Sequence, residues 1–171
     1  MENKERIELK RKLREISKSE YPIDNDTYNF FLETVNEVNP TQKEMINMIH
    51  NLMKFYYLDE NDIELNLADF LLNKITNENL NHYKLSSLYY VAICNNCIPV
   101  FEMLLIYNIP VIQEVYDDLN EYVKNLEEYR FMNPFVNFFE VKDMFEDLTI
   151  HYRKNKIEHL KSNIAASKQV V

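Results

Sequence analysis

The sequence contains no glycine and no tryptophan, and only five prolines and two cysteines. Glycine-rich phosphate loops and dinucleotide-binding fingerprints are therefore excluded, because both need backbone without a Cβ close to phosphate. A chain without glycine has no low-strain route to positive φ, so we expect Asn at helix ends and in tight turns. Two cysteines are too few for a disulfide framework.

No run of apolar residues reaches the length of a membrane span, and the N-terminus lacks the basic-then-apolar order of a signal peptide. These absences predict a cytoplasmic protein without a membrane span, located in its own cell or in a host cell. The net charge is −9, and the acidic body of the chain argues against nucleic acid as a partner. The 171 residues, of which 46% are hydrophobic and 27% charged, fit one globular domain, residues 1–171.

Two stretches of the chain repeat at an offset of 33 residues. Residues 84–110, KLSSLYYVAICNNCIPVFEMLLIYNIP, align with residues 51–77, NLMKFYYLDENDIELNLADFLLNKITN. In this register Leu71 corresponds to Leu104, and both are expected in the core of a second helix. A fixed offset of this size is typical of stacked helix-pair repeats, so each stretch is predicted to contain one helix pair.

Hydrophobic spacing predicts further helices around these repeats. The expected helices before the second repeat cover residues 4–18, 27–38, 41–58 and 63–74. Asp24, Asn25 and Asp26 supply N-cap candidates for the second of them, and Thr41 with Glu44 forms a capping box at the start of the third. In the first helix the acids nearly balance the bases, so we interpret it as a solvated cap rather than as a basic arm for a membrane or an acidic partner.

After the second repeat, residues 111–130 and 135–145 are expected to form another helix pair, and whether residues 111–171 contain a third repeat stays open. No stretch alternates as a strand would, and short connectors predict antiparallel neighbours. The predicted fold class is therefore all-α. Residues 1–40 are expected to form an N-terminal helical cap, residues 41–110 the repeats, and residues 111–171 a C-terminal helical cap.

Residues 86–110 resemble an ankyrin repeat. The segment Ser86-Ser87-Leu88-Tyr89-Tyr90-Val91-Ala92 stands where that family carries Thr-Pro-Leu-His-x-Ala-Ala, and residues 100–105 stand where its second helix carries Val and paired Leu. Asn95 or Asn96 takes the position of the family's inter-helix Gly. Ser87 replaces Pro and Tyr89 replaces His, so we expect connector tips that depart from regular hairpin fingers. The resemblance implies antiparallel helix pairs stacked as a short ankyrin-like solenoid with helical caps.

Cys94 and Cys97 form the only pattern with metal or redox precedent. A zinc site needs two more ligands, and the four histidines show no paired ligand spacing. They are His50, His82, His151 and His159. A thioredoxin-like site needs a βαβ unit, which is missing from the predicted fold. We therefore interpret both cysteines as packing residues and expect no metal or other cofactor.

The acidic residues form no recognised catalytic or calcium-binding motif. In residues 59–62 the calcium-loop pattern fails, because its third oxygen ligand falls on Ile63 and its glycine is absent. Asp117 and Asp118 are interpreted as a solvated helix face, and no Ser or Cys nucleophile belongs to a recognised triad motif. The sequence therefore predicts that the protein is not an enzyme.

The twelve Tyr and ten Phe are more informative about function than the cysteines or the acidic residues, because Tyr combines contact area with a polar group and is common at interfaces. Tyr89 and Tyr90 point about 100° apart in a helix, so at most one of them belongs to the core. In ankyrin-like stacks the connector tips and first helices form the binding face. The resemblance places on that face Tyr56 or Tyr57, Asp59, Glu60, His82, Tyr83, Lys84, Tyr89 or Tyr90, Asp117 and Glu121.

These observations together predict a non-catalytic protein–protein interaction module that binds and sequesters a protein partner. The mixture of aromatic and acidic residues indicates a partner with a basic, partly apolar surface. Small size, repeats and an AT-rich composition fit a viral, phage or bacterial factor that acts on a host or competitor protein. The alternative is a toxin-neutralising immunity protein or antitoxin with a generic all-α fold, whose acidic body covers a basic active site. The oligomeric state does not follow from the sequence.

Overall fold

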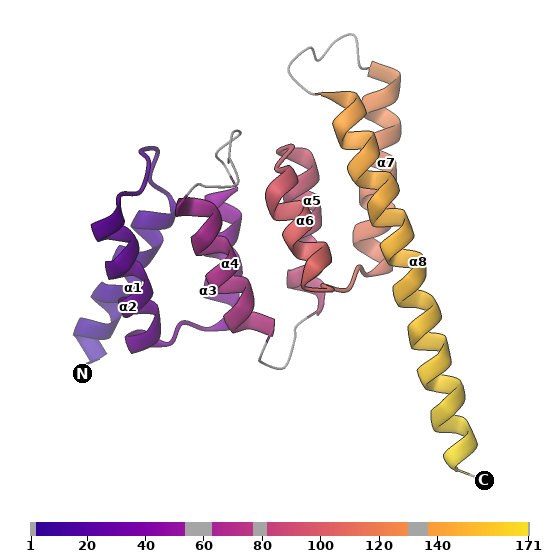
Figure 1. The fold of residues 1–171 in the computed structure, drawn as a ribbon, viewed down its shortest axis with the longest axis horizontal. Coiled ribbons are helices and arrows are strands. Elements are labelled where there is room, and N and C mark those ends of the chain that lie inside the picture. The colour runs from indigo at the N-terminus through magenta and orange to yellow at the C-terminus, as the bar shows by residue number, and fades with distance from the viewer. Residues whose placement is uncertain (1–2, 54–62, 77–81, 130–136, 171) are drawn as a thin grey trace.

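The computed structural model describes residues 3–53, 63–76, 82–129 and 137–170. Within these ranges the chain forms helices and no strands, which confirms the predicted all-α class (Figure 1). The helices are α1 (Asn3–Ser17), α2 (Asn25–Val38), α3 (Gln42–Leu52), α4 (Ile63–Thr76), α5 (His82–Cys94), α6 (Ile98–Ile106), α7 (Gln113–Tyr129) and α8 (Phe138–Gln169).

The helices pack as four hairpins that stand side by side (Figure 1). Each hairpin joins consecutive helices, α1 with α2, α3 with α4, α5 with α6, and α7 with α8. The first helices α1, α3, α5 and α7 contact one another in that order, and the second helices α2, α4, α6 and α8 do the same. The result is a two-layer stack in which one hydrophobic core runs from the first hairpin to the last.

The 33-residue offset holds for the second helices and is wrong for the first. Leu71 and Leu104 are fully buried in α4 and α6, as the offset requires. However, α3 begins at Gln42 and α5 at His82, which lie forty residues apart. The chain between α3 and α4 is much longer than the three-residue link between α5 and α6, so a single offset cannot align both layers. Residues 54–58, predicted to extend α3, lie outside the described residues.

Local capping signals are confirmed at two helix starts and three helix ends. The Asp24 side chain accepts a hydrogen bond from the backbone N–H of Thr27, and Thr41 with Glu44 forms the complete capping box of α3. Among the described residues, positive φ occurs at three asparagines and at no other residue type. They are Asn39, Asn96 and Asn108. Asparagine thus takes the left-handed positions that glycine occupies in most chains.

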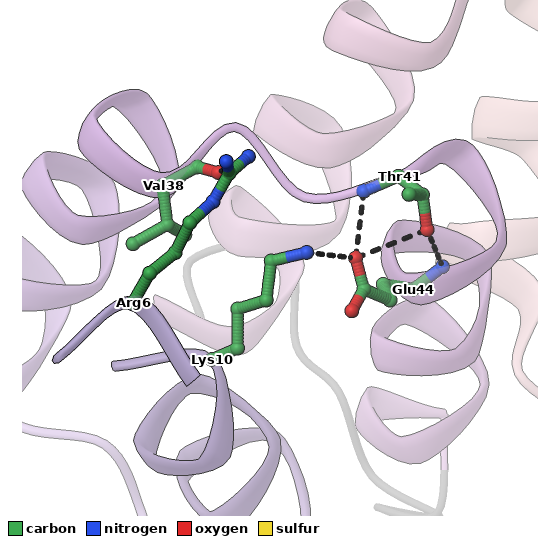
Figure 2. A network of polar contacts seen from close by, with 5 residues as sticks. All are labelled: Arg6, Lys10, Val38, Thr41 and Glu44. Carbon is green, nitrogen blue, oxygen red and sulfur yellow. Dashed lines mark hydrogen bonds and ion pairs between the residues drawn. The ribbon is translucent and has the colours of Figure 1, made fainter. Parts of the chain in front are cut away.

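The first helix is held to the stack by its own basic residues (Figure 2). Lys10 Nζ lies 2.8 Å from Glu44 Oε2, and the same carboxylate oxygen accepts hydrogen bonds from the backbone N–H and the hydroxyl of Thr41. Arg6 donates to the Val38 carbonyl at 2.9 Å, at the C-terminal end of α2, where the helix dipole favours a cation. These contacts agree with the interpretation of residues 4–18 as a cap.

The last helix is much longer than the predicted segment 135–145. It runs for 32 residues, and its C-terminal half extends beyond α7 and the rest of the stack (Figure 1). Buried residues that face the stack continue past the predicted end, at Leu148, His151 and Tyr152, and only the residues after Tyr152 lack a buried side. Residues 111–170 therefore contribute a complete fourth hairpin and a projecting helical extension.

Candidate protein-binding surface

One side of α5 carries a stripe of exposed and half-buried side chains. Tyr83, Ser87, Tyr90 and Cys94 follow one another at spacings of four, three and four residues, which places them on the same side of the helix. Tyr83 is 55% exposed and Tyr90 is 38% exposed. The opposite side of α5 is buried, so the stripe has a fixed orientation on the surface of the stack.

The stripe continues onto α7 through an aromatic contact. The ring of Tyr90 lies 6.2 Å from the ring of Tyr122, at an interplanar angle of 54°. Asp118 lies one helical turn before Tyr122, and its charge acts on Tyr90. We refer to Tyr83, Ser87, Tyr90, Cys94, Asp118 and Tyr122 together as the α5–α7 face.

The phenols and the thiol at the centre of this face are uncharged at neutral pH. Burial, with smaller contributions from the neighbouring Cys94, raises the pKa of Tyr122 to about 12. Burial also raises the pKa of Tyr90, with smaller contributions from Cys94 and Asp118. Burial raises the pKa of the Cys94 thiol as well, against the opposing hydrogen bonds of both tyrosines. The centre is therefore a neutral, partly apolar patch with hydroxyl groups at its edges.

Negative charge surrounds this patch on α7. The helix carries six carboxylates and one lysine, and all seven side chains are exposed. Among them are the predicted residues Asp117 and Glu121, which lie on the solvent side of α7. Asp117 accepts a hydrogen bond from Gln113 at 2.8 Å, which orients its carboxylate. A neutral aromatic patch beside an acidic helix complements a basic surface with apolar groups.

Tyr89 is not available to a partner, so its prediction as a binding residue is wrong. It is completely buried, and its hydroxyl donates to the carbonyl of Leu104 at 3.1 Å and to the carbonyl of Ile109 at 2.8 Å. His151 Nε2, on α8, lies 2.9 Å from the same Ile109 oxygen, which requires the Nε2–H tautomer because a carbonyl only accepts. Tyr89 and His151 thus stabilise the link between α6 and α7. Of the two neighbouring tyrosines, Tyr90 is the exposed one.

The remaining predicted residues divide into two groups. Lys84 is half-buried on α5, and its backbone carbonyl accepts a hydrogen bond from the Ser87 hydroxyl at 2.6 Å. His82 is the first residue of α5, and its side chain lies outside the described part of the chain. The other four predicted residues also fall outside the described ranges. They are Tyr56, Tyr57, Asp59 and Glu60.

Cys94 and Cys97 occupy separate environments. Cys94 belongs to the α5–α7 face, whereas Cys97 is buried at the start of α6. Burial raises the pKa of the Cys97 thiol to about 11, so the thiolate needed for metal binding or disulfide exchange is scarce at neutral pH. Among the described residues, no three His, Cys, Asp or Glu side chains are grouped closely enough to hold a metal ion.

Sequence reasoning missed four members of the surface, which are Ser87, Cys94, Asp118 and Tyr122. A signal was present, because Tyr90 and Cys94 are four residues apart on one helix, as Asp118 and Tyr122 are on another. What the sequence did not reveal is that these two helices are neighbours in the same layer.

Open hollows also lie elsewhere on the described surface, including two that are separate from the α5–α7 face. One, of about 410 Å³, lies between α1 and α2 and is lined by Lys12, Asp26 and Phe30 among others. The other, of about 280 Å³, lies between α4 and α6 and includes Asp69 and the exposed Ile106. Neither includes a residue of the α5–α7 face.

Comparisons of the chain with protein-family models, with curated proteins and with solved structures found no significant match. The resemblance to the ankyrin repeat therefore stays a prediction. In the described part of the chain, no helix combines the length and the apolar character needed to cross a membrane.

Proposed function

We propose that the protein is a non-catalytic binding module whose α5–α7 face takes up a basic, partly apolar surface of another protein. The observation that carries this proposal is the exposed tyrosine stripe of α5 beside the six carboxylates of α7. Large aromatic side chains supply much of the binding energy at interfaces, while surrounding charges select the partner and speed its approach.

The stack supports such a role because its surface is rigid where the partner would bind. Tyr83 and Tyr90 project from a helix whose other side is buried in the core. Tyr122 and Cys94 pack against Tyr90 and limit its rotation. Little conformational entropy is therefore lost when these side chains become buried in an interface.

The biological role we propose is sequestration of a host or competitor protein by a small viral, phage or bacterial factor. The acidic surface of α7 also favours a second candidate, an immunity protein or antitoxin that covers the basic active site of a toxin. The identity of the partner distinguishes them, since a basic nuclease-like enzyme fits the second role and a regulatory protein fits the first.

Affinity capture followed by calorimetry tests the proposal. Tagged wild-type protein is used as bait in lysate, the captured protein is identified and purified, and its affinity is measured for Tyr83→Ala and Tyr90→Ala. Each substitution should weaken binding by about 2 kcal/mol, or about thirtyfold. Tyr21→Ala is the matched control, because Tyr21 is 79% exposed at a distant site between α1 and α2, and it should leave binding unchanged.

Two results would contradict the proposed surface. Binding that is unaffected by both α5 substitutions would place the interface elsewhere. Loss of binding in Ile106→Ala, with the α5 variants unchanged, would place it at the hollow between α4 and α6 instead. Association should also slow as salt is raised, since steering by opposite charges is screened beyond about 10 Å at 0.1 M salt.

A further inference from the structure

Beyond Lys156, which donates a hydrogen bond to Gln113 Oε1 on α7, the C-terminal half of α8 has no packing partner within the described chain. From residue 153 to residue 170 every side chain is exposed except Asn155, which is half-buried. Three large apolar residues nevertheless lie in this segment. Ile157 is 52% exposed, Leu160 58% and Ile164 54%. Their spacing of three and four residues places them on one side of the helix.

This apolar side continues into the half of α8 that packs on the stack, with Arg153 and Lys154 between Ile150 and Ile157. Ile150 is exposed one heptad before Ile157, and Glu146 is exposed one turn before Ile150. On the opposite side of the same half, Val141, Met144 and Leu148 are buried. We define the outer face of α8 as Glu146, Ile150, Ile157, Leu160, Lys161 and Ile164, all of which point away from the stack.

The two halves of α8 carry opposite charge. Residues 138–152 contain four carboxylates and one lysine, whereas residues 153–170 contain five basic side chains and one carboxylate. Within the described chain, neither Glu146 nor Lys161 forms an ion pair with another residue. A helix of this kind is complementary in charge to a second copy of itself that runs in the opposite direction.

We propose that the outer face of α8 binds a second copy of this chain, with the two α8 helices antiparallel about a two-fold axis near residues 153–154. In this register Ile150 lies opposite the partner's Ile157, and Glu146 lies opposite the partner's Lys161. Because the axis is two-fold, each of these contacts is made twice. The two stacks lie on opposite outer sides of the helix pair, so they do not block it.

Charge favours this occupant over the two main competitors. A parallel pair would place the five basic side chains of one copy beside those of the other, which is repulsive. An anionic membrane would attract the basic half of α8 but repel the carboxylates around Glu146 on the same face. The antiparallel pair brings Ile150 of each copy against Ile157 of the other and sets the acidic half of each helix along the basic half of its partner. Arg153 and the partner's Lys154 meet near the axis and are the like-charge contact that these pairs must offset.

Sedimentation velocity across a range of concentrations tests the proposal on the full chain. We expect a monomer–dimer equilibrium for the wild type. Ile157→Asp should abolish the dimer, because it places a carboxylate at the central apolar contact. Ile106→Asp, at an equally exposed isoleucine on α6, is the matched control and should leave the equilibrium unchanged.

A charge exchange tests the register. Glu146→Lys should raise the dissociation constant about tenfold, because two lysines then face each other at two equivalent positions. Lys161→Glu should have a similar effect. The double variant Glu146→Lys with Lys161→Glu should restore most of the wild-type affinity, since each pair is again opposite in charge. If Glu146 and Lys161 were exposed without facing each other across the dimer, the double variant would not recover the wild-type affinity.

Three outcomes would overturn the proposal. The first is a wild-type chain that stays monomeric at every concentration, and the second is a dimer that survives Ile157→Asp. The third is a monomer that sediments with vesicles of anionic phospholipid and loses this binding in Ile157→Asp, which would assign the outer face of α8 to a membrane surface. Circular dichroism of each variant confirms that its helices are intact.

Discussion

The first helix and the C-terminal half of α8 lie at opposite ends of the stack, and both are rich in charged residues (Figure 1). The charged residues of the two helices differ in the contacts that they form. In α1, Arg6 and Lys10 bond to groups on α2 and α3. In α8, Arg153 and Lys161 form no ion pair within the described chain. Charge content alone therefore does not separate a structural cap from an interaction element. The difference is whether the rest of the fold offers partners at the right positions.

Replacement of a leucine by alanine on α1 and on α8 should give the largest difference in the free energy of unfolding. Leu13→Ala on α1 removes a side chain that is 1% exposed, and should lower the free energy of unfolding by about 2–5 kcal/mol. Leu160→Ala on α8 removes an exposed side chain and should change it by less than about 0.5 kcal/mol. Urea unfolding measures both, at a concentration where the protein is monomeric. Equal losses would mean that the end of α8 packs against its own chain.

Removal of single charged side chains from the two helices should give a smaller difference in the free energy of unfolding. Glu44→Ala removes both the reciprocal half of the α3 capping box and the ion pair with Lys10, and should cost about 1–2 kcal/mol. Lys10→Ala isolates the ion pair and should cost up to about 1 kcal/mol. Lys161→Ala should leave the unfolding free energy of the monomer unchanged. A loss in Lys161→Ala as large as in Glu44→Ala would contradict this contrast.

The smallest expected effect is the pH dependence of the stability that Glu44 contributes. Partial burial raises the pKa of Glu44, but hydrogen bonds from Lys10 and Thr41 hold it below the ordinary value of 4.5. The folded state thus binds this proton less readily than the unfolded chain does. The stabilisation is complete above the ordinary pKa of a glutamate and is lost as the pH falls through the lower pKa of the folded state.

Glu44→Gln, which cannot titrate, should therefore lose less stability than the wild type between about pH 5 and pH 3. Glu158→Gln, on the exposed half of α8, is the matched control and should follow the wild-type curve. Thermal unfolding at closely spaced pH values measures the difference. Identical curves for Glu44→Gln and the wild type would show that the contacts of Glu44 do not depend on its charge.

Features set by neighbouring residues were predictable from the sequence. The capping box of Thr41 and Glu44 was predicted, and the left-handed residue after α5 was expected at Asn95 or Asn96, because both features depend on a few adjacent residues. The choice between Tyr89 and Tyr90 was not, because it depends on how α5 is rotated against α6 and α8. The contact between Tyr90 and Tyr122 required knowing that α5 and α7 are neighbours. The end of α8 could not be placed from the sequence, because the residues after Tyr152 have no stack to face and so lack a buried side.

The Ile109 carbonyl has a consequence for how the stack comes apart. Both of its lone pairs are used, one by the Tyr89 hydroxyl from the third hairpin and one by the His151 ring from the fourth. Neither hairpin can separate from the α6–α7 link without breaking a buried bond to the same oxygen. The two hairpins therefore open as one cooperative unit, and amide protons at the centres of α5 and α8 exchange with solvent at a common rate. A pull on the projecting end of α8 therefore acts on the bonds that this oxygen forms with His151 and Tyr89.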